Sequence, residues 1–269
     1  MRKKLLETYG IFEGCEDLAI EIADKIYEKW CQGENTSPEP FTINCSWASR
    51  GYIAICPTKQ NVRAGYLLDY KQTHNQTIIV VNPLILDWRY ENATLGSLMH
   101  ELTHAYRDCQ RRRGNNSEME GAVRRGYNKT FDYKFRTNEE DRTIIKNDLS
   151  TFLYWTDAME KPAFFAGMYA KVRYSIAEYD DAKDYLEAFK STREYNEFLN
   201  ILYLGKLLSS HTTPRKQKEV LDAANELTNY NFTTFDQVRK HIISRSKKLE
   251  KTLKTVIPKM VMKMMEYEE

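Results

Sequence analysis

Apolar residues recur with a helical period over most of the chain, and three short stretches have the pattern of strands. Residues 14–32 place their apolar side chains on one face of a helix. Strands are expected at 42–47 and 51–56, joined as a hairpin, and at 77–81, where four β-branched apolar residues run together. The helical period returns after residue 142. It predicts helices at 143–155, 160–177, 179–190, 193–209, 215–228 and 234–265.

A further helical pattern runs from about residue 92 to 113. Its apolar positions fall on one side of the helix, and His100 and His104 fall on the other side. Asn92 or Thr94 is expected to cap its N-terminus, and Gly114 follows its last turn. The apolar stripe consists of Leu95, Leu98, Met99, Leu102 and Tyr106.

Strands early in the chain and helices late in it predict an α+β fold. We expect a mostly helical protein with a small antiparallel sheet next to the 92–113 helix. The expected domains are a core at residues 1–175 and a C-terminal helical region at 176–269 that packs on it. Lysines interleave with apolar residues at 234–265. Packing of this apolar stripe on the body is favoured over binding to a membrane surface or a partner helix.

Composition restricts the class of protein. Of the 269 residues 42% are hydrophobic, which is enough for a globular core without disulfides. The 40 basic and 38 acidic residues give a net charge of +2, which argues against nucleic acid or a membrane surface as the main partner. Segment 106–136 holds nine Lys or Arg and four acidic residues. A solvated or substrate-binding rim is favoured there over nucleic-acid contact.

Cysteine usage and hydropathy indicate the compartment. The five cysteines include no C-x-x-C pair, which is typical of reduced thiols in a cytoplasm. Glu7, Glu13 and Glu16 interrupt any signal-peptide core, and no apolar run approaches the ~20 residues of a membrane span. We therefore expect a cytoplasmic protein.

Residues 100–104 read His-Glu-Leu-Thr-His, an H-E-x-x-H motif. Positions i and i+4 of a helix share a face, so the imidazoles of His100 and His104 can bind one tetrahedral metal at about 2.0–2.1 Å. Glu101 lies about 100° further round the helix. From there it can take a proton from a water on the metal and act as general base. Zn²⁺ is the expected cofactor, and a pair of structural histidines is the alternative.

A catalytic zinc needs a third protein ligand and one open coordination position. Glu160 is the preferred third ligand. It shares a helix face with Ala166 and Gly167, and these small residues let its helix approach the motif helix closely. Glu118 and Glu120 are rivals, and a role limited to capping its own helix is the alternative for Glu160.

The segment His100–Ala105, followed on a later helix by Glu160-x-x-Ala163, resembles the gluzincin zinc metallopeptidases. The Glu-x-x-Ala helix resembles the compact members of that group, the ImmA/IrrE type found in bacteria and phages. The resemblance covers about residues 76–170. The motif helix also resembles that of thermolysin. The later helix departs from thermolysin because Phe164 stands where that type has an Asp.

This resemblance implies a zincin-like fold and the hydrolysis of peptide bonds in peptide or protein substrates. Glu101 would act first as base and then as acid. The zinc ligands would be His100, His104 and Glu160. Two alternatives are kept. One is a non-catalytic regulatory or binding protein that retains the gluzincin fold, and the other is a nucleic-acid-associated protein that uses the basic 107–136 segment.

Two supporting roles are also expected around the motif. Asp108 either accepts a hydrogen bond from a ligand histidine or forms an i,i+4 ion pair with Arg112. Peptide hydrolysis also needs a donor to the tetrahedral oxyanion. Tyr154 is the candidate because it closely precedes the Glu160 helix, with Tyr169 and His211 as alternatives.

Overall fold

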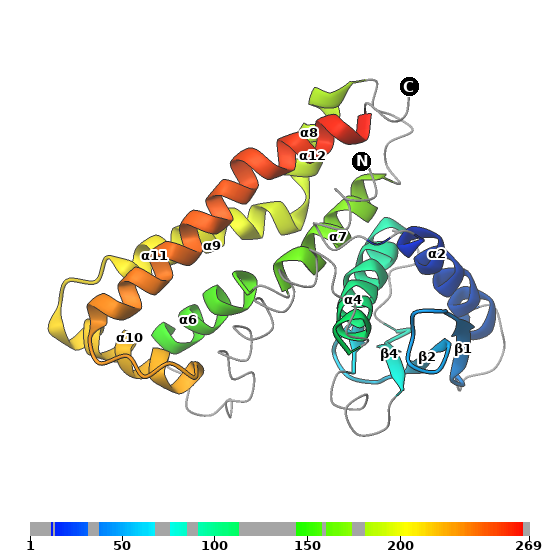
Figure 1. The fold of residues 1–269 in the computed structure, drawn as a ribbon, viewed down its shortest axis with the longest axis horizontal. Coiled ribbons are helices and arrows are strands. Elements are labelled where there is room, and N and C mark those ends of the chain that lie inside the picture. The colour runs from blue at the N-terminus through cyan, green and yellow to red at the C-terminus, as the bar shows by residue number, and fades with distance from the viewer. Residues whose placement is uncertain are drawn as a thin grey trace. The chain divides into compact units, whose positions relative to one another are not determined.

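The computed structural model describes residues 12, 14–31, 38–67, 76–84, 91–112, 144–157, 160–173 and 181–265. Figure 1 colours them along the chain. Contacts within the chain divide it into two units that alternate in sequence. The first comprises Met1–Val123 and Pro162–Asp180, and the second comprises Arg124–Lys161 and Asp181–Glu269. Most of the predicted basic segment 107–136, including all of it after Arg112, lies outside the described residues.

The first unit contains a four-stranded sheet in the order β1-β2-β4-β3. β1 (Phe41–Asn44) pairs antiparallel with β2 (Tyr52–Pro57), which confirms the predicted hairpin. β2 pairs parallel with β4 (Thr77–Val81), and β4 pairs antiparallel with β3 (Ala64–Tyr66). The prediction of an antiparallel sheet is therefore wrong, and the sheet is mixed. The reason is the unpredicted β3, which reverses the chain between β2 and β4.

Three helices belong to the described part of the first unit. They are α2 (Cys15–Ile26), which continues as a π-helical turn, α4 (Glu91–Arg112), which carries the H-E-x-x-H motif, and α7 (Glu160–Arg173). α2 and α4 pack side by side over the sheet (Figure 1). Asn92 and Thr94 both lie inside α4, so neither caps it as predicted.

The central strands of the sheet are covered on both faces. Ile53, Ala54 and Ile55 are consecutive residues of β2, and all three are buried. Residues 77–79 of β4 are buried in the same way. Successive side chains of a strand point to opposite faces, so burial without alternation means that neither face is open to water. The sheet therefore gives α4 a rigid support.

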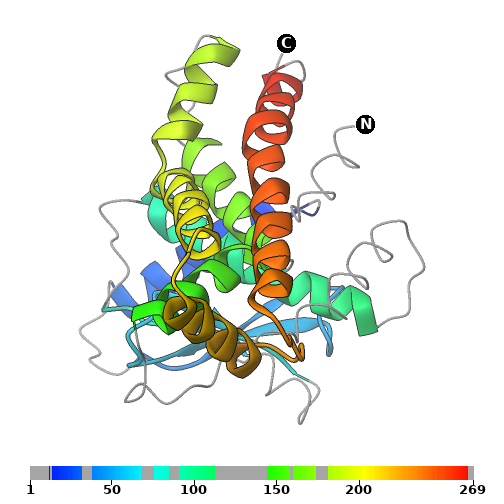
Figure 2. The ribbon, with the colours of Figure 1, turned by 90° about the vertical axis from the view of Figure 1, so that its left-hand side faces the viewer.

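The second unit is built from helices joined by short loops. They are α6 (Ile144–Trp155), α8 (Ala182–Ser191), α9 (Arg193–Ser209), α10 (Pro214–Leu227), α11 (Phe235–Lys251) and α12 (Ile257–Met265), with a π-helical turn, η4 (Thr252–Val256), between the last two. α9 and α11 lie side by side along most of their length (Figures 1 and 2). α6, which sequence analysis assigned to residues 1–175, packs on α9 and α10.

The apolar stripe of the C-terminal helices is buried within the second unit. Its buried members are Val238, Ile242, Leu249, Leu253, Ile257 and Val261. The prediction that the apolar stripe of 234–265 is buried by packing is confirmed, and its partners are helices of the second unit. Packing of 176–269 on a core at 1–175 stays a prediction. Among the described residues, no helix combines the length and the apolar content that crossing a membrane requires.

Candidate metal centre

α4 brings the two motif histidines together. The Nε2 atoms of His100 and His104 lie 3.1 Å apart, and the ring centroids lie 4.8 Å apart at an interplanar angle of 72°. Two nitrogens that share a tetrahedral metal at about 2.0–2.1 Å lie about 3.3 Å from each other. The i,i+4 spacing on one helix therefore places both nitrogens at the separation of a two-nitrogen chelate.

Two glycines determine how closely α7 approaches α4. A Cβ atom on Gly167 would come within 2.9 Å of the Gly96 carbonyl oxygen, and one on Gly96 would come within 3.0 Å of the Gly167 carbonyl oxygen. Both obstacles are backbone atoms, so any side chain at these positions would push the helices apart. This confirms the close approach expected at Gly167. It also identifies Gly96, one turn before His100, as its partner.

Glu160 is the first residue of α7. The boundary between the two units falls after Lys161, inside α7. Glu160 is grouped with the second unit, but it belongs to the helix whose later residues pack on α4. The ligand atoms of His100, His104 and Glu160 all lie within 4.8 Å of one another, and the Oε2 atom of Glu160 is buried. We call these three residues the ligand cluster. The structure brings the three predicted ligands together, and they can hold a metal ion.

The ring of Phe164 covers one side of the ligand cluster. It lies one turn beyond Glu160 on α7, and its centroid is 4.8 Å from that of His100 in an edge-to-face arrangement. An apolar ring at this place fixes the orientation of the imidazole and lowers the local dielectric constant. This is the position at which the sequence departs from the thermolysin pattern. Here it contributes packing instead of a carboxylate.

The donor atoms restrict which ion fits. Two imidazole nitrogens and one carboxylate suit a transition metal better than Mg²⁺ or Ca²⁺, which prefer oxygen ligands. Three protein ligands also leave one tetrahedral position for water or substrate. The side chains of His100 and Glu101 are 14% and 15% exposed, so the site is partly open. The rival ligands Glu118 and Glu120 lie outside the described residues.

β3 holds the Glu101 carboxylate through its backbone. Directly after this edge strand, the N–H of Leu67 donates to the carbonyl oxygen of Ile78 in β4. Backbone N–H groups of successive extended residues point in opposite directions, so the N–H of Tyr66 points away from β4. That N–H donates to Glu101 Oε2 at 2.7 Å. The other carboxylate oxygen, Oε1, lies 3.9 Å from His100 Nε2. One oxygen of Glu101 is therefore anchored on the sheet, while the other faces the ligand cluster.

The side chain of Tyr66 reaches a second carboxylate further along α4. Its hydroxyl donates to Asp108 Oδ2 at 2.8 Å, and Asp108 is fully buried. Glu101 and Asp108 are seven residues apart, so they share a helix face, and one residue of β3 contacts both. The expected partners of Asp108, a ligand histidine or Arg112, stay predictions. The Arg112 side chain lies outside the described side chains. Tyr66 could not be anticipated from the sequence, because a three-residue strand shows no period.

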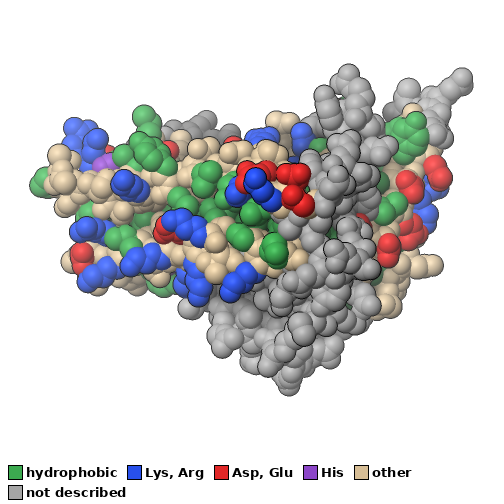
Figure 3. All heavy atoms as spheres, turned by 90° about the horizontal axis from the view of Figure 1, so that it is seen from above, with side chains coloured by type: hydrophobic (Ala, Val, Ile, Leu, Met, Phe, Trp, Pro, Cys, Tyr) green, Lys and Arg blue, Asp and Glu red, His purple; other side chains and the backbone are tan. Residues whose placement is uncertain are grey.

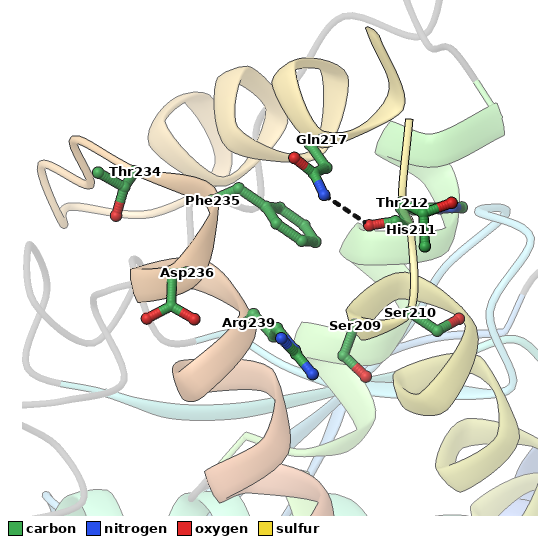
Figure 4. A pocket seen from close by; sticks show the side chains of 9 residues that line it. All are labelled: Ser209, Ser210, His211, Thr212, Gln217, Thr234, Phe235, Asp236 and Arg239. Atoms are coloured by element: carbon green, nitrogen blue, oxygen red, sulfur yellow. Dashed lines mark hydrogen bonds between the residues drawn. The ribbon is translucent and has the colours of Figure 1, made fainter. Parts of the chain in front are cut away.

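The predicted oxyanion donors lie at three different places. Tyr154 is on α6 in the second unit, and its role stays a prediction. Tyr169 donates to Glu16 of α2 at 3.4 Å. It is nine residues along α7 from Glu160, a distance of roughly 13 Å. His211 lines a hollow of about 480 Å³ in the second unit, where its carbonyl oxygen accepts a hydrogen bond from Gln217 at 2.8 Å (Figure 4).

That hollow has a polar lining but no set of metal ligands. Ser209 and Ser210, at the end of α9, donate their hydroxyls to carbonyl oxygens of the same helix. Asp236, which lines the hollow, is paired at 2.8 Å with Lys240, which does not line it. Within the described ranges, the ligand cluster is the one group of three His, Cys, Asp or Glu side chains with ligand atoms close enough for a metal. The metal centre is therefore the candidate site.

Comparison with known proteins found no match to a protein-family model, a curated protein or a solved structure.

Proposed function

We propose that this protein is a zinc metallopeptidase that uses Glu101 as its general base. The observation that carries the proposal is the ligand cluster next to a carboxylate anchored on a strand edge. Two histidines and one glutamate with an open fourth position are typical of catalytic zinc centres in peptidases. The order of residues in the H-E-x-x-H motif supports the same assignment.

Zinc bound here would polarise a peptide carbonyl and lower the pKa of a water to about 7. Residues of this chain would orient the attacking water and transfer its proton. The Tyr66 N–H holds Glu101 Oε2, which leaves Oε1 to accept a proton from the attacking water. Glu101 then delivers that proton to the nitrogen of the leaving amine. Tyr154 is the proposed donor to the oxyanion.

A peptide is the favoured substrate class because of the strand beside the base. β3 is at the edge of the sheet and contacts α4. Apart from the Tyr66 N–H, which is bonded to Glu101, the outward backbone groups of such an edge can bind an extended peptide through hydrogen bonds. This would place a carbonyl group of the peptide near the catalytic carboxylate.

The cysteines support a cytoplasmic location for this activity. All five are free thiols, and Cys15, Cys45 and Cys109 are buried. Burial raises the pKa of the Cys15 thiol well above its ordinary value, which keeps it protonated and unreactive. Thiols of this kind suit a reducing compartment.

Metal analysis of purified protein tests the ligand cluster. Wild type should hold about one zinc per chain, and Glu101→Gln should keep it. His104→Ala and Glu160→Ala should each lower zinc affinity by at least about a hundredfold, since each removes a direct ligand. Glu219→Gln, an exposed carboxylate on α10, is the matched control and should bind zinc normally. Full zinc affinity in Glu160→Ala would remove Glu160 from the ligand set.

Hydrolysis of a mixed peptide library by the zinc-loaded protein tests the activity. Wild type should cleave peptide bonds, and Glu101→Gln should cleave them about 10²–10⁴-fold more slowly, the range expected for loss of a general base. Both proteins must contain equal zinc for this comparison. Zinc-loaded wild type that cleaves no peptide would favour the non-catalytic alternative.

A further inference from the structure

α11 carries a lysine face directly opposite its buried face. At about 100° per residue, Lys240, Lys247 and Lys251 fall within about 40° of one another. Ile242 and Leu249, about 180° away, are buried. A shallow groove of about 460 Å³ runs along the lysine face. We call it the lysine groove, and it is lined by Lys240, Ile243, Ser244, Lys247, Lys248 and Lys251.

Most of the positive charge in the lysine groove is not neutralised by described residues. Lys240 pairs with Asp236 at 2.8 Å. Lys247, Lys248 and Lys251 form no ion pair within the part of the chain that the structure describes. Among the described residues that line the groove, none has a carboxylate. Neighbouring unpaired lysines repel each other, so an anion bound here would relieve that repulsion.

Positive charge is concentrated in this part of the sequence. Residues 235–265 contain nine Lys or Arg and two acidic residues, while the whole chain has a net charge of only +2. The remaining residues together are therefore net negative. Figure 3 shows Lys and Arg side chains at intervals along the helices of the second unit. Basic residues are therefore concentrated at 235–265 and acidic residues elsewhere, although the net charge of the chain is small. This distribution favours an anionic partner for residues 235–265.

We propose that the lysine groove binds the phosphate backbone of a double-stranded nucleic acid. Lys240 and Lys251 are eleven residues apart, so the lysines extend over about 16 Å of helix. A duplex carries one negative charge per about 1.7 Å of its axis, so several phosphates face such a row. The described residues that line the groove include no aromatic side chain on which an unpaired base could stack, which favours a duplex over a single strand.

Two other anionic partners fit the observations less well. Amphipathic helices bind membranes by inserting their apolar face, but the apolar stripe of α11 and α12 is buried within the second unit. An acidic protein surface would need carboxylates spaced like the lysines, whereas a duplex supplies regular charge along its whole length. The nucleic-acid site is independent of the metal centre, because it uses α11 alone.

Fluorescence anisotropy with a labelled 30-base-pair DNA of mixed sequence tests the proposal on the full-length protein. Wild type should bind it at low salt, with an affinity that falls steeply between about 50 and 200 mM salt. Lys247→Glu/Lys251→Glu should weaken binding at least about tenfold and reduce the salt slope by about two. Lys216→Glu/Lys218→Glu is the matched control. It makes the same charge change at two exposed lysines on α10 and should alter the affinity less than about threefold.

Circular dichroism must show that both charge-reversal variants are folded. If Lys247→Glu/Lys251→Glu is not folded, Lys247→Gln/Lys251→Gln replaces it. The proposal is overturned by an absence of binding at 50 mM salt or by equal weakening in both reversal variants. Tighter binding to single-stranded DNA, anionic phospholipid vesicles or polyglutamate than to the duplex would also overturn it. His104→Ala should bind the duplex as wild type does, so failure of the metal centre leaves this test unaffected.

Discussion

The carboxylates of α4 in the first unit and the exposed ion pairs of α10 in the second unit are held in different ways. In the first unit, α4 buries Asp108 completely and leaves Glu101 15% exposed, and both accept hydrogen bonds from Tyr66. On α10 in the second unit, Arg215 and Glu219 pair along the outside of one helix at 3.1 Å. That unit also has an inward charge, because Lys146 of α6 is buried and pairs with Glu226 of α10. An exposed pair contributes little to stability, while a buried charge must be held by its neighbours. On α4 the inward carboxylates lie on the helix that carries the ligand cluster, so their supports can be tested against an exposed pair.

Removing the buried carboxylate should have the largest effect. Asp108→Ala deletes the acceptor of the Tyr66 hydroxyl at a fully buried position. We expect the free energy of unfolding to fall by about 3 kcal/mol, because the fully buried carboxylate and its hydrogen bond to the Tyr66 hydroxyl are both lost. Glu219→Ala, whose side chain is 40% exposed in the second unit, should change it little. Denaturant unfolding measures both, and equal losses would contradict the contrast between the units.

Adding a methyl group at each of two tightly packed glycines should distinguish a loss of zinc affinity from a loss of stability alone. Gly167→Ala meets the Gly96 carbonyl oxygen, a backbone atom that cannot rotate away. Gly205→Ala, in the second unit, meets Ser246 Oγ and the ring of Phe152, which are side-chain atoms. Both variants should lose about 1–3 kcal/mol of stability through overpacking. Only Gly167→Ala should also lose zinc affinity, by about tenfold, because it moves α7 and with it the third ligand.

Competition with a zinc-binding dye measures the affinity of both glycine variants. Normal affinity in Gly167→Ala would mean that α7 reaches the metal without the close contact to α4. Weakened affinity in Gly205→Ala would mean that the two units are coupled. Either result would remove the glycine contact as the feature that sets the position of Glu160.

Removing one hydroxyl group should test how β3 supports the catalytic base. Tyr66→Phe keeps the backbone N–H that holds Glu101 but loses the bond to Asp108. We expect a loss of about 1–2 kcal/mol in stability and, on the proposed function, about a tenfold lower hydrolysis rate. Tyr203→Phe, at a residue that is 70% exposed on α9, is the control and should change neither. An unchanged rate in a destabilised Tyr66→Phe would limit this bond to a structural role.

The periodic parts of the fold could be predicted from the sequence. The helix at 193–209 and the strand at 77–81 have the predicted bounds, because the helix repeats its apolar positions at a helical period and the strand is a run of four β-branched apolar residues. The ligand pair His100 and His104 followed from one helical spacing, which is a local property. Glu160 could be anticipated because small residues such as Gly167 share its helix face, and these indicate close packing.

The remaining features depend on contacts between distant segments. β3 has three residues, too few to show a period, and its pairing with β4 made the sheet mixed. Tyr66 was missed for the same reason, although it contacts two carboxylates of α4. Gly96 looked like an ordinary helical glycine until α7 was placed against it. Local propensity carries no information about which distant residue fills such a contact.

The smallest expected effect is a pH dependence of the second unit, where one histidine is partly buried on α11. Burial, followed by the charges of Arg245 and Lys248, lowers the pKa of His241 from its ordinary value of 6.5 to about 4. The neutral ring is held in place, because its Nε2 accepts a hydrogen bond from Arg245 Nε at 2.9 Å. The rings of Tyr230 and Phe232 pack against it with centroids 5.0 and 5.7 Å away.

A folded-state pKa below the unfolded value means that protonation favours the unfolded chain. The stability that His241 contributes is therefore complete above pH 6.5 and is lost as the pH falls from 6.5 towards 4. Allowing for solvent screening at this partly exposed site, we expect a loss of about 1 kcal/mol between about pH 7 and pH 5. His241→Gln keeps an acceptor for Arg245 but has no charge to gain, so its stability should change less over that range. Denaturant unfolding at both pH values measures the difference. An equal pH dependence in wild type and His241→Gln would assign the effect to other groups.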